Sequence, residues 1–319
     1  MTHPVTRRDA LRTFAAAGLA AAAGNASAAP APAGRKMTID LACGSIGVRA
    51  TTPEAIALAA KYGFESIGVD TGYLASLSDS QLAELKSDLA AHHLVLGAAG
   101  LGIEFRRDDA TFQDGLEKLP AEAKTLQRAG VTRVGTWLSP THDRLTYLAN
   151  FRQHRDRLKQ AAAVLGDHGV RLGLEYVGPK TSWTVAKYPF IHTMAEMKEL
   201  IHAIGRDNVG MVLDSWHWYC SGETVADLKS LKATDVVAVD LNDAPAGIPV
   251  DRQMDLVRDL PCATGVIDVK GFLGGLLAIG YDGPVRAEPF RPDLGKLPAD
   301  EAVARTAAAM KKAFALIGG

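Results

Sequence analysis

The sequence predicts an α/β protein that folds as a single (β/α)8 TIM barrel, and two observations support this prediction. The first is a local pattern in which an amphipathic stretch ends near a glycine and a short apolar run follows. The glycines at these junctions are Gly63, Gly130, Gly169, Gly205 and Gly280. Glycine is favoured where a helix ends in a left-handed conformation. Each of these glycines is therefore expected to end a helix just before a strand.

The second observation is the number and order of the apolar runs. Eight runs are expected to be strands, near 38–43, 65–70, 95–100, 133–138, 171–176, 209–214, 235–240 and 284–288. They are rich in Val, Leu and Ile without alternation, as is typical of strands buried on both faces. Helical patterns cover 53–62, 80–93, 145–166, 194–205, 269–280 and 299–317. Strict strand–helix alternation indicates a parallel sheet, and eight units match a closed barrel.

Two absent motifs and the composition narrow the class of protein further. No GxGxxG follows the first strand and no GxxxxGK[ST] occurs anywhere, which argues against open nucleotide-binding folds. The 319 residues are 47% hydrophobic, enough for one large core, and the net charge is -1. Such a charge creates no basic surface for a phosphate backbone. We therefore expect no nucleic-acid partner.

The N-terminal segment, residues 1–28, is predicted to be a signal peptide. Arg7 and Arg8 precede an apolar stretch at 14–23, and Ala26-Ser27-Ala28 offers a small-x-small cleavage site. The segment resembles a twin-arginine export signal, which implies a periplasmic or secreted protein. The alternative is a disordered or helical tail.

The rest of the chain is expected to consist of a linker and one domain. Residues 29–36 form a short Ala/Pro linker, and residues 37–319 form the barrel. No second hydrophobic segment approaches membrane-spanning length, so no membrane partner is expected after signal removal. The sequence leaves open whether the protein forms a homo-oligomer.

Four carboxylates stand at the ends of the last four predicted strands, namely Glu175, Asp214, Asp240 and Glu288. Working residues of such barrels lie at the carboxyl ends of the strands, so these side chains are expected to converge. Four close anions repel one another unless a cation lies among them. We therefore predict a divalent metal site. Oxygen ligands favour Mn²⁺ or Mg²⁺, with Co²⁺ and Zn²⁺ as alternatives. For each residue singly, the alternative is a carboxylate that pairs with a basic neighbour or caps a helix.

Two further residues are candidates for substrate contact. His217 lies three residues after Asp214 and could bind the metal, hydrogen-bond a substrate hydroxyl or orient a carboxylate. A histidine with only structural partners is the alternative. Trp137 ends the fourth predicted strand, and together with Trp216 and Trp218 it could wall a pocket for a sugar ring or pack the loops.

Several segments taken together resemble the sugar phosphate isomerase/epimerase superfamily, the xylose isomerase-like barrels. They are LGLEYVGPK, VGMVLDSWHWY, VVAVDLNDAPAG, LPCATGVIDVKGF and YDGPVRAEPF. The resemblance spans nearly the whole predicted barrel. It implies a divalent ion, often Mn²⁺, held by Glu, Asp, His and Glu from strands 5 to 8. It also implies that the two glutamates, Glu175 and Glu288 here, move protons on opposite faces of the substrate. His217 matches a substrate-contacting histidine, and Arg258 is the nearest match to an arginine that contacts substrate.

The chain departs from this family pattern at one position. The strand 7 ligand, frequently histidine in H-x-N-D, is Asp240 in DLND. An aspartate is expected to add a fourth negative charge and to shift the preference toward harder metals. The alternatives are that Asp240 only supports the site, or that Asp243 takes part.

The predicted function is that of a metal-dependent sugar isomerase or epimerase. It would abstract a proton next to the carbonyl of a ketose, keto-glycoside or keto-polyol through a metal-stabilised enediolate. The alternatives are a lyase or dehydratase that uses the same intermediate, and a non-catalytic exported sugar-binding barrel. An abasic-site endonuclease would need many histidines at strand ends. Here His92, His93, His154 and His168 fall in helical or connecting stretches.

Overall fold

The structure is a computed structural model that describes residues 34–318. The predicted signal peptide and most of the predicted linker lie outside the described residues, so both stay predictions. From Arg35 onward the chain forms one compact unit. None of the helices within residues 34–318 has the length and apolar character needed to cross a membrane.

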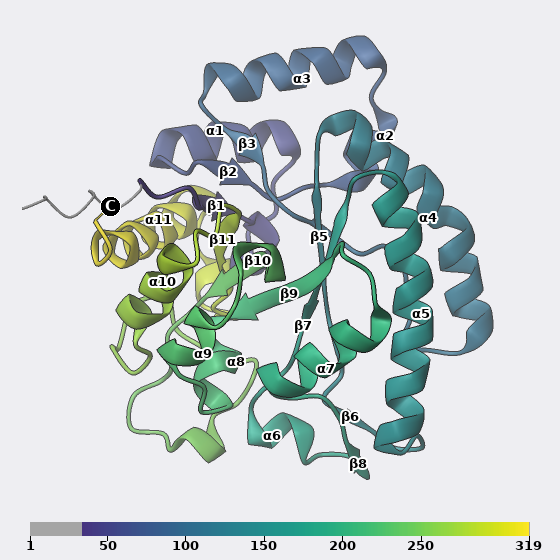
Figure 1. Cartoon of the computed structure of the whole chain (residues 1–319). Helices are drawn as coiled ribbons and strands as arrows, with labels where there is room; N and C mark the ends of the chain where they lie inside the picture. The colour runs from purple at the N-terminus through teal and green to yellow at the C-terminus, as the bar shows by residue number, and fades with distance from the viewer. Residues whose placement is uncertain (1–33, 319) are drawn as a thin grey trace, which may run out of the picture. The chain divides into compact units, whose positions relative to one another are not determined.

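A single parallel sheet forms the centre of this unit (Figure 1). Its strands, in sheet order, are β3 (Val95–Leu96), β2 (Ser66–Ile67), β1 (Thr38–Leu41), β11 (Pro284–Ala287), β10 (Val236–Leu241), β9 (Val209–Asp214), β7 (Arg171–Glu175), β5 (Arg133–Trp137) and β4 (Ala99–Gly100). The short strands β3 and β4 are two pieces of one segment, and they pair with β2 and β5, respectively. The sheet therefore curls round and closes through this segment, and its strands match the eight predicted runs. The predicted TIM barrel is confirmed.

Helices surround the sheet (Figure 1). The longer ones are α1 (Thr52–Tyr62), α3 (Asp79–Ala91), α4 (Asp109–Ala129), α5 (Tyr147–Asp167), α7 (Met194–Ile204), α10 (Val269–Ala278) and α11 (Ala299–Ala315). The shorter ones are α2 (Thr71–Ser76), α6 (Lys180–Trp183), α8 (Ser215–Cys220) and α9 (Val225–Lys229). An antiparallel pair, β6 (Thr141–His142) and β8 (Tyr188–Pro189), lies apart from the barrel sheet.

Local sequence signals account for where many of these helices begin and end. At the start of α1, Thr51 and Glu54 form a reciprocal capping box, and Thr193 and Glu196 do the same for α7. The five glycines predicted to end helices all have positive φ, between 64° and 85°. This conformation is strained for residues with a Cβ atom, which explains why glycine stands there. The predicted helix ends are thus confirmed.

Buried apolar strand residues such as Leu172, Leu174 and Val239 alternate with the residues that face the barrel interior, so they face the surrounding helices. One layer of the barrel interior is charged. Strand register pairs Asp40 of β1 with Arg286 of β11, Arg286 with Asp240 of β10, and Asp240 with Asp214 of β9. Partners in register on neighbouring parallel strands point to the same side of the sheet. Four strands therefore place charged side chains in one layer, next to the site described below.

Candidate active site

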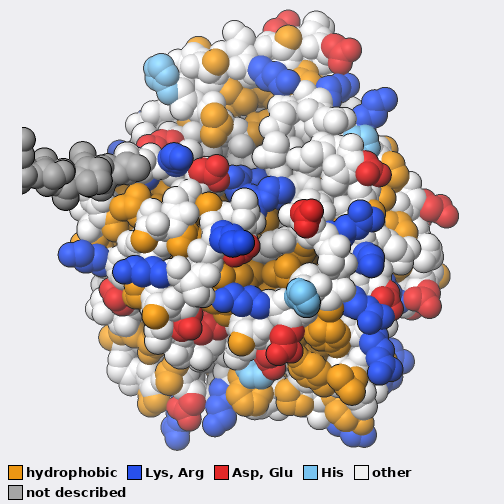
Figure 2. Space-filling view, viewed as in Figure 1, with side chains coloured by type: hydrophobic (Ala, Val, Ile, Leu, Met, Phe, Trp, Pro, Cys, Tyr) orange, Lys and Arg blue, Asp and Glu red, His pale blue; other side chains and the backbone are white. Residues whose placement is uncertain are grey.

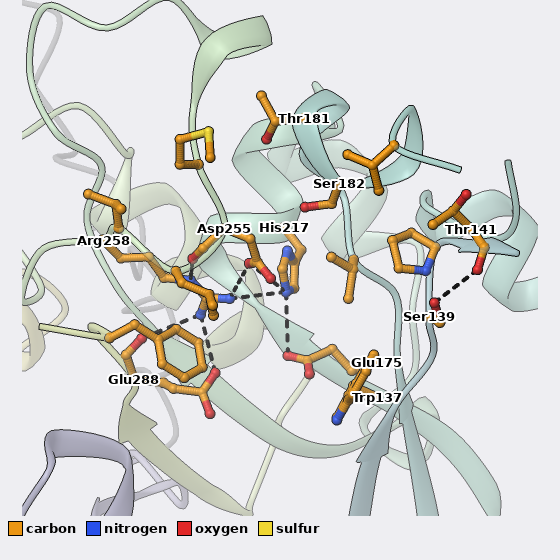
Figure 3. Close-up of a pocket in the computed structure, with 17 residues that line it drawn as sticks. Trp137, Ser139, Thr141, Glu175, Thr181, Ser182, His217, Asp255, Arg258 and Glu288 are labelled. Carbon is orange, nitrogen blue, oxygen red and sulfur yellow. Dashed lines mark hydrogen bonds and ion pairs between the residues drawn. The ribbon is translucent and has the colours of Figure 1, made fainter. Parts of the chain in front are cut away.

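A cavity of about 750 Å³ opens where β5, β7 and β11 end (Figure 3). One side of it is polar and is formed by Glu175, His217, Asp255, Arg258 and Glu288, which we call the polar group. Another part of its lining is apolar and includes Trp137 and Phe290. Such a volume is within the range of about 300–1,000 Å³ typical of small-molecule sites.

The four carboxylates predicted from strand ends do come together. One potential ligand atom from each of Glu175, Asp240 and Glu288 lies within 4.8 Å of the others, and the same holds for Glu175, Asp214 and His217. Two oxygens that bind one ion at about 2.0–2.6 Å can be at most about 5 Å apart. The spacing within each of these two groups, which share Glu175, is therefore compatible with one divalent ion.

Burial and mutual repulsion make it costly for these carboxylates to be ionised together. Burial, followed by the charge of Asp240, raises the pKa of Glu288 to about 8. Burial also raises the pKa of Asp214 to about 6, although Arg258 opposes the shift. The pKa of Glu175 is raised well above its ordinary value by burial and then by Glu288. A cation placed among these groups would favour their ionised forms.

Glu175 shows a further sign of a missing partner. Its Oε1 is buried and accepts no hydrogen bond from the described residues. A buried acceptor without a partner costs about 1–3 kcal/mol, and more when it is charged. The side chains that surround it supply mainly oxygen ligands, together with one imidazole nitrogen. The residues of this site therefore fit a divalent cation.

Arg258 is buried and bridges three acidic side chains, two of which, Asp255 and Glu288, are drawn in Figure 3. Its Nη1 donates to Asp214 Oδ2 at 2.6 Å and to Glu288 Oε2 at 3.2 Å, and its Nη2 donates to Asp255 Oδ1 at 2.8 Å. The resemblance implied a substrate contact for Arg258, and the side chain does line the cavity. In this arrangement, however, protein carboxylates occupy both terminal nitrogens. Arg258 therefore sets the positions of Asp214 and Glu288.

Arg286, which the sequence analysis missed, neutralises Asp240. Its Nη2 donates to Asp240 Oδ2 at 3.0 Å, and its Nε donates to Oδ1. The same Nη2 lies 3.4 Å from Glu288 Oε1. Asp240 therefore contributes the expected fourth carboxylate, but this carboxylate is already paired with an arginine. The sequence did contain a signal for Arg286. In PVRAEPF it stands two residues before Glu288, and residues two apart along a strand face the same side.

His217 is buried in the short helix α8, and its ring is neutral. Burial, and then the charge of Arg258, lowers the pKa of His217 well below its ordinary value. Its Nδ1 accepts a hydrogen bond from the Gly178 N–H at 3.2 Å, whereas Arg258 Nη2 lies 3.3 Å from Nε2. A neutral imidazole has one acceptor nitrogen, so the ring can accept from only one of these donors at a time. Nε2 lies 3.8 Å from Asp214 Oδ2 and 3.9 Å from Glu175 Oε1.

Asp243, the alternative to Asp240 as a ligand, has a structural role instead. Its Oδ1 accepts from the Ala244 and Ile267 N–H groups, and its Oδ2 accepts from those of Thr264 and Gly265. Three of these four bonds, those from Thr264, Gly265 and Ile267, hold the segment that leads into α10. Asp243 is therefore not part of the carboxylate cluster.

Asn242, which precedes Asp243, forms hydrogen bonds with two residues of the carboxylate cluster. It donates to Asp214 Oδ1 at 2.9 Å and accepts from the Glu288 N–H at 3.0 Å. These two bonds link the end of β9 to the end of β11. The cluster thus has a buried support that the DLND motif alone did not reveal.

Among the aromatic candidates, only Trp137 lines the cavity. Trp216 and Trp218 are buried, and the ring of Trp218 packs against Phe272. The guanidinium of Arg106 lies 4.4 Å from the centre of the Trp137 ring, and its Nη2 donates to Thr136 Oγ1 at 2.8 Å. Arg106 therefore supports the Trp137 ring at the edge of the cavity.

Residues 56–313 match the family model described as xylose isomerase-like TIM barrel. The chain belongs to this family. This xylose isomerase-like barrel is 26% identical over 250 residues to inosose isomerase of Bacillus velezensis, a match that covers 77% of the chain and 86% of that relative. It is also 24% identical over 255 residues to 3-dehydroshikimate dehydratase of Pseudomonas putida, which covers 77% of the chain but 37% of that longer protein.

Solved structures agree with this assignment of the xylose isomerase-like barrel. A xylose isomerase domain protein from Alicyclobacillus acidocaldarius superposes with a TM-score of 0.76 at 30% identity, over 89% of this chain and 100% of that chain. The IOLI protein with a bound zinc atom gives a TM-score of 0.71 at 25% identity, over 86% and 96% of the two chains. D-psicose 3-epimerase gives 0.69 at 18% identity, over 89% and 100%, a similarity that shows the fold alone. The family resemblance noted from the sequence is confirmed.

Proposed function

We propose that this barrel is a divalent-metal-dependent sugar isomerase or epimerase that moves a proton at a carbon next to a carbonyl. The substrate would be a ketose, a keto-glycoside or a keto-polyol. The observation that carries the proposal is the pair Glu175 and Glu288, which enter one cavity from β7 and from the end of β11 (Figure 3). Burial raises the pKa of both carboxylates, and raises that of Glu288 to about 8, so Glu288 can hold or release a proton near neutral pH. The inosose isomerase relatives support an isomerase activity.

The ion would be held by Glu175, Asp214 and Glu288, with Asp240 and His217 as the remaining candidates. Mn²⁺ is proposed first because most of the ligand atoms are oxygens, with Mg²⁺, Co²⁺ and Zn²⁺ as alternatives. The zinc atom bound to the similar IOLI protein supports a divalent metal in this barrel. A bound divalent ion would act as a Lewis acid on the substrate carbonyl.

The chain's own residues would carry out the proton transfers. One of the two glutamates removes the proton next to the carbonyl, and the other returns a proton. Return to the opposite face of the same carbon gives epimerisation, and return to the neighbouring carbon gives isomerisation. Arg258 keeps Glu288 near Asp214, and the Nε2 of the neutral His217 lies where it can contact a substrate oxygen.

The decisive experiment is exchange of solvent deuterium into the substrate. The metal-loaded protein is incubated with candidate keto-sugars in deuterated water, and label at the carbon next to the carbonyl is followed by NMR. Turnover without label at that carbon contradicts the proton-transfer mechanism. Ligand binding without either turnover or exchange would instead indicate a non-catalytic sugar-binding barrel.

A dehydratase is the second candidate, and the similarity to 3-dehydroshikimate dehydratase favours it. The same first proton removal can be followed by loss of a hydroxyl or alkoxyl group from the next carbon. The two reactions differ in their products, because elimination releases water or an alcohol and creates a conjugated double bond. Ultraviolet absorbance of the product therefore separates them.

We also propose export by the twin-arginine route, to the periplasm or outside the cell. The support is the paired Arg7 and Arg8 before an apolar stretch and a small-x-small site. Replacement of both arginines by lysine should keep the precursor in the cytoplasm, whereas the unaltered chain should yield a shortened periplasmic form. An unaltered chain that stays full-length and cytoplasmic contradicts the proposal.

A further inference from the structure

The outer part of the cavity is lined by exposed apolar side chains. Trp137, Val185, Met254, Leu256 and Val257 all line it, and 49–73% of each residue is exposed to solvent. They come from three separate parts of the chain: the end of β5, the loop after α6, and the segment before Arg258. Figure 2 shows hydrophobic side chains gathered over the region that α6, β6 and β8 occupy in Figure 1. Large apolar side chains concentrated around one opening usually mark a binding surface.

The segment that carries three of these side chains is held at both ends. Gln253, at one end, donates to the carbonyls of Pro245 and Ile248, and its own carbonyl accepts from Thr181 Oγ1 at 2.6 Å. Arg258, at the other end, donates to the Asp255 carbonyl at 2.9 Å and to its carboxylate at 2.8 Å. The apolar side chains between these anchors are therefore presented in a defined position at the edge of the polar group.

The cavity is also larger than a single sugar requires. A free hexose has about a dozen non-hydrogen atoms, and even at about 30 Å³ each, the volume of a water molecule in the liquid, it occupies about half of the cavity. If the sugar ring lies against Glu175 and Glu288, the remaining volume lies beside the apolar side chains. A polar substituent there would lose contact with water without gaining hydrogen-bond partners.

This inference rests on the proposed function. We infer that the outer cavity is a subsite for an apolar substituent of the substrate, such as an aryl or alkyl group joined to the keto-sugar by a glycosidic bond. The surface is concave and continuous with the polar group, which suits part of the same small molecule better than a flat protein partner. The ring of Trp137, supported by Arg106, offers a face against which an aromatic group can pack.

The test is a comparison of binding by matched pairs of glycosides. Phenyl and methyl hexosides without a ketone bind without turnover, so their affinities measured by titration calorimetry report the subsite alone. Burial of about 60 Å² of apolar surface is worth about tenfold in affinity. We expect the phenyl member of at least one pair to bind about tenfold more tightly than its methyl counterpart. In Leu256→Ser/Val257→Ser this ratio should fall below about threefold.

Leu148→Ser is the matched control, since Leu148 is equally exposed but does not line the cavity. It should leave the ratio unchanged. Equal affinities of phenyl and methyl glycosides for the unaltered protein, or no binding of either, overturn the inference. The inference is also overturned if the unaltered protein is a dimer, Leu256→Ser/Val257→Ser is a monomer, and the phenyl-to-methyl affinity ratio is the same for both. The apolar side chains would then form an interface between two copies of the chain. If the protein exchanges deuterium into a free ketose but binds phenyl and methyl glycosides equally well, only the subsite is refuted. If it prefers the phenyl glycosides but catalyses no exchange, only the proposed function is refuted.

Discussion

The guanidinium of Arg286 lies against both carboxylate oxygens of Asp240, and the register of β10 and β11 places the two residues side by side. Arg258 donates to one oxygen of Asp214. When all are ionised, the four carboxylates of the cluster and these two arginines carry a formal charge of -2. One divalent ion would neutralise that charge. Binding of the ion by Asp240 would therefore compete with Arg286, which donates to both of its oxygens.

Arg286→Met is expected to tighten divalent-ion binding by about tenfold. The substitution removes a fixed positive charge near Glu288 and frees the oxygens of Asp240, and one tenfold step corresponds to about 1.4 kcal/mol. Calorimetric titration of metal-free protein with Mn²⁺ measures the effect. Arg286→Lys keeps the charge and should bind the ion nearly as the unaltered protein does. Weaker binding in Arg286→Met would mean that Arg286 orients the carboxylates more than it competes with the ion.

Glu175→Gln and Glu288→Gln should each lower the rate of deuterium exchange by about 10²–10⁴-fold, the usual contribution of a general acid or base. Glutamine keeps the shape of the side chain but cannot take up the substrate proton. NMR measurement of label next to the carbonyl checks this. Both variants must also be tested for metal content, because either glutamate can hold the ion. A variant that retains metal and exchanges at the normal rate is not the proton carrier.

The stability of the metal-free protein should fall as the pH rises from about 6.5 to about 8. The folded-state pKa of Glu288 is raised to about 8, so folding favours its protonated form. The resulting stabilisation is complete below the unfolded-state pKa of about 4.3 and is lost as the pH rises through the folded-state value. The buried His217 has a lowered pKa and acts in the opposite direction, but mainly below about pH 6.5.

Thermal unfolding in the presence of a chelator measures this dependence. A saturating divalent ion should remove it, because the ion binds the ionised carboxylates and stabilises the folded state. Glu288→Gln should reduce the slope in the chelator. A metal-free protein that is equally stable at both pH values would contradict the raised pKa values of the cluster.

Asp243→Ala should destabilise the fold by at least about 3 kcal/mol, because four backbone N–H groups would lose their acceptor. Urea unfolding measures the loss. Metal affinity at low temperature, where the variant is still folded, should stay within about threefold of the normal value. A large drop in affinity with little loss of stability would return Asp243 to the list of candidate ligands.

Much of the fold could be predicted because it depends on local patterns. Apolar runs without alternation marked the strands, and glycines such as Gly63 and Gly130 marked helix ends, since a left-handed residue favours glycine in any context. Predicted strands follow one another in order around a barrel, so the meeting of Glu175, Asp214, Asp240 and Glu288 also followed from their positions at strand ends.

The pairing of charges within the site could not be predicted in this way. Whether Asp240 contacts Arg286, and whether Arg258 bridges Asp214 and Glu288, depends on strand register and on the path of the loops. The residues of these pairs are 30 to 46 positions apart in the chain. The same holds for Trp137, which lines the cavity while Trp216 and Trp218 are buried.

By itself, the sequence determined the barrel, its family and the four acidic strand ends, because these follow from patterns within short segments and from the order of those segments along the chain. Only the tertiary structure decided which carboxylates already have a cationic partner, which one has an unsatisfied oxygen, and where the apolar wall of the cavity lies. Electrostatic and apolar contacts act over a few ångströms in space, and a distance of that kind between segments far apart in the chain exists only after the barrel has closed.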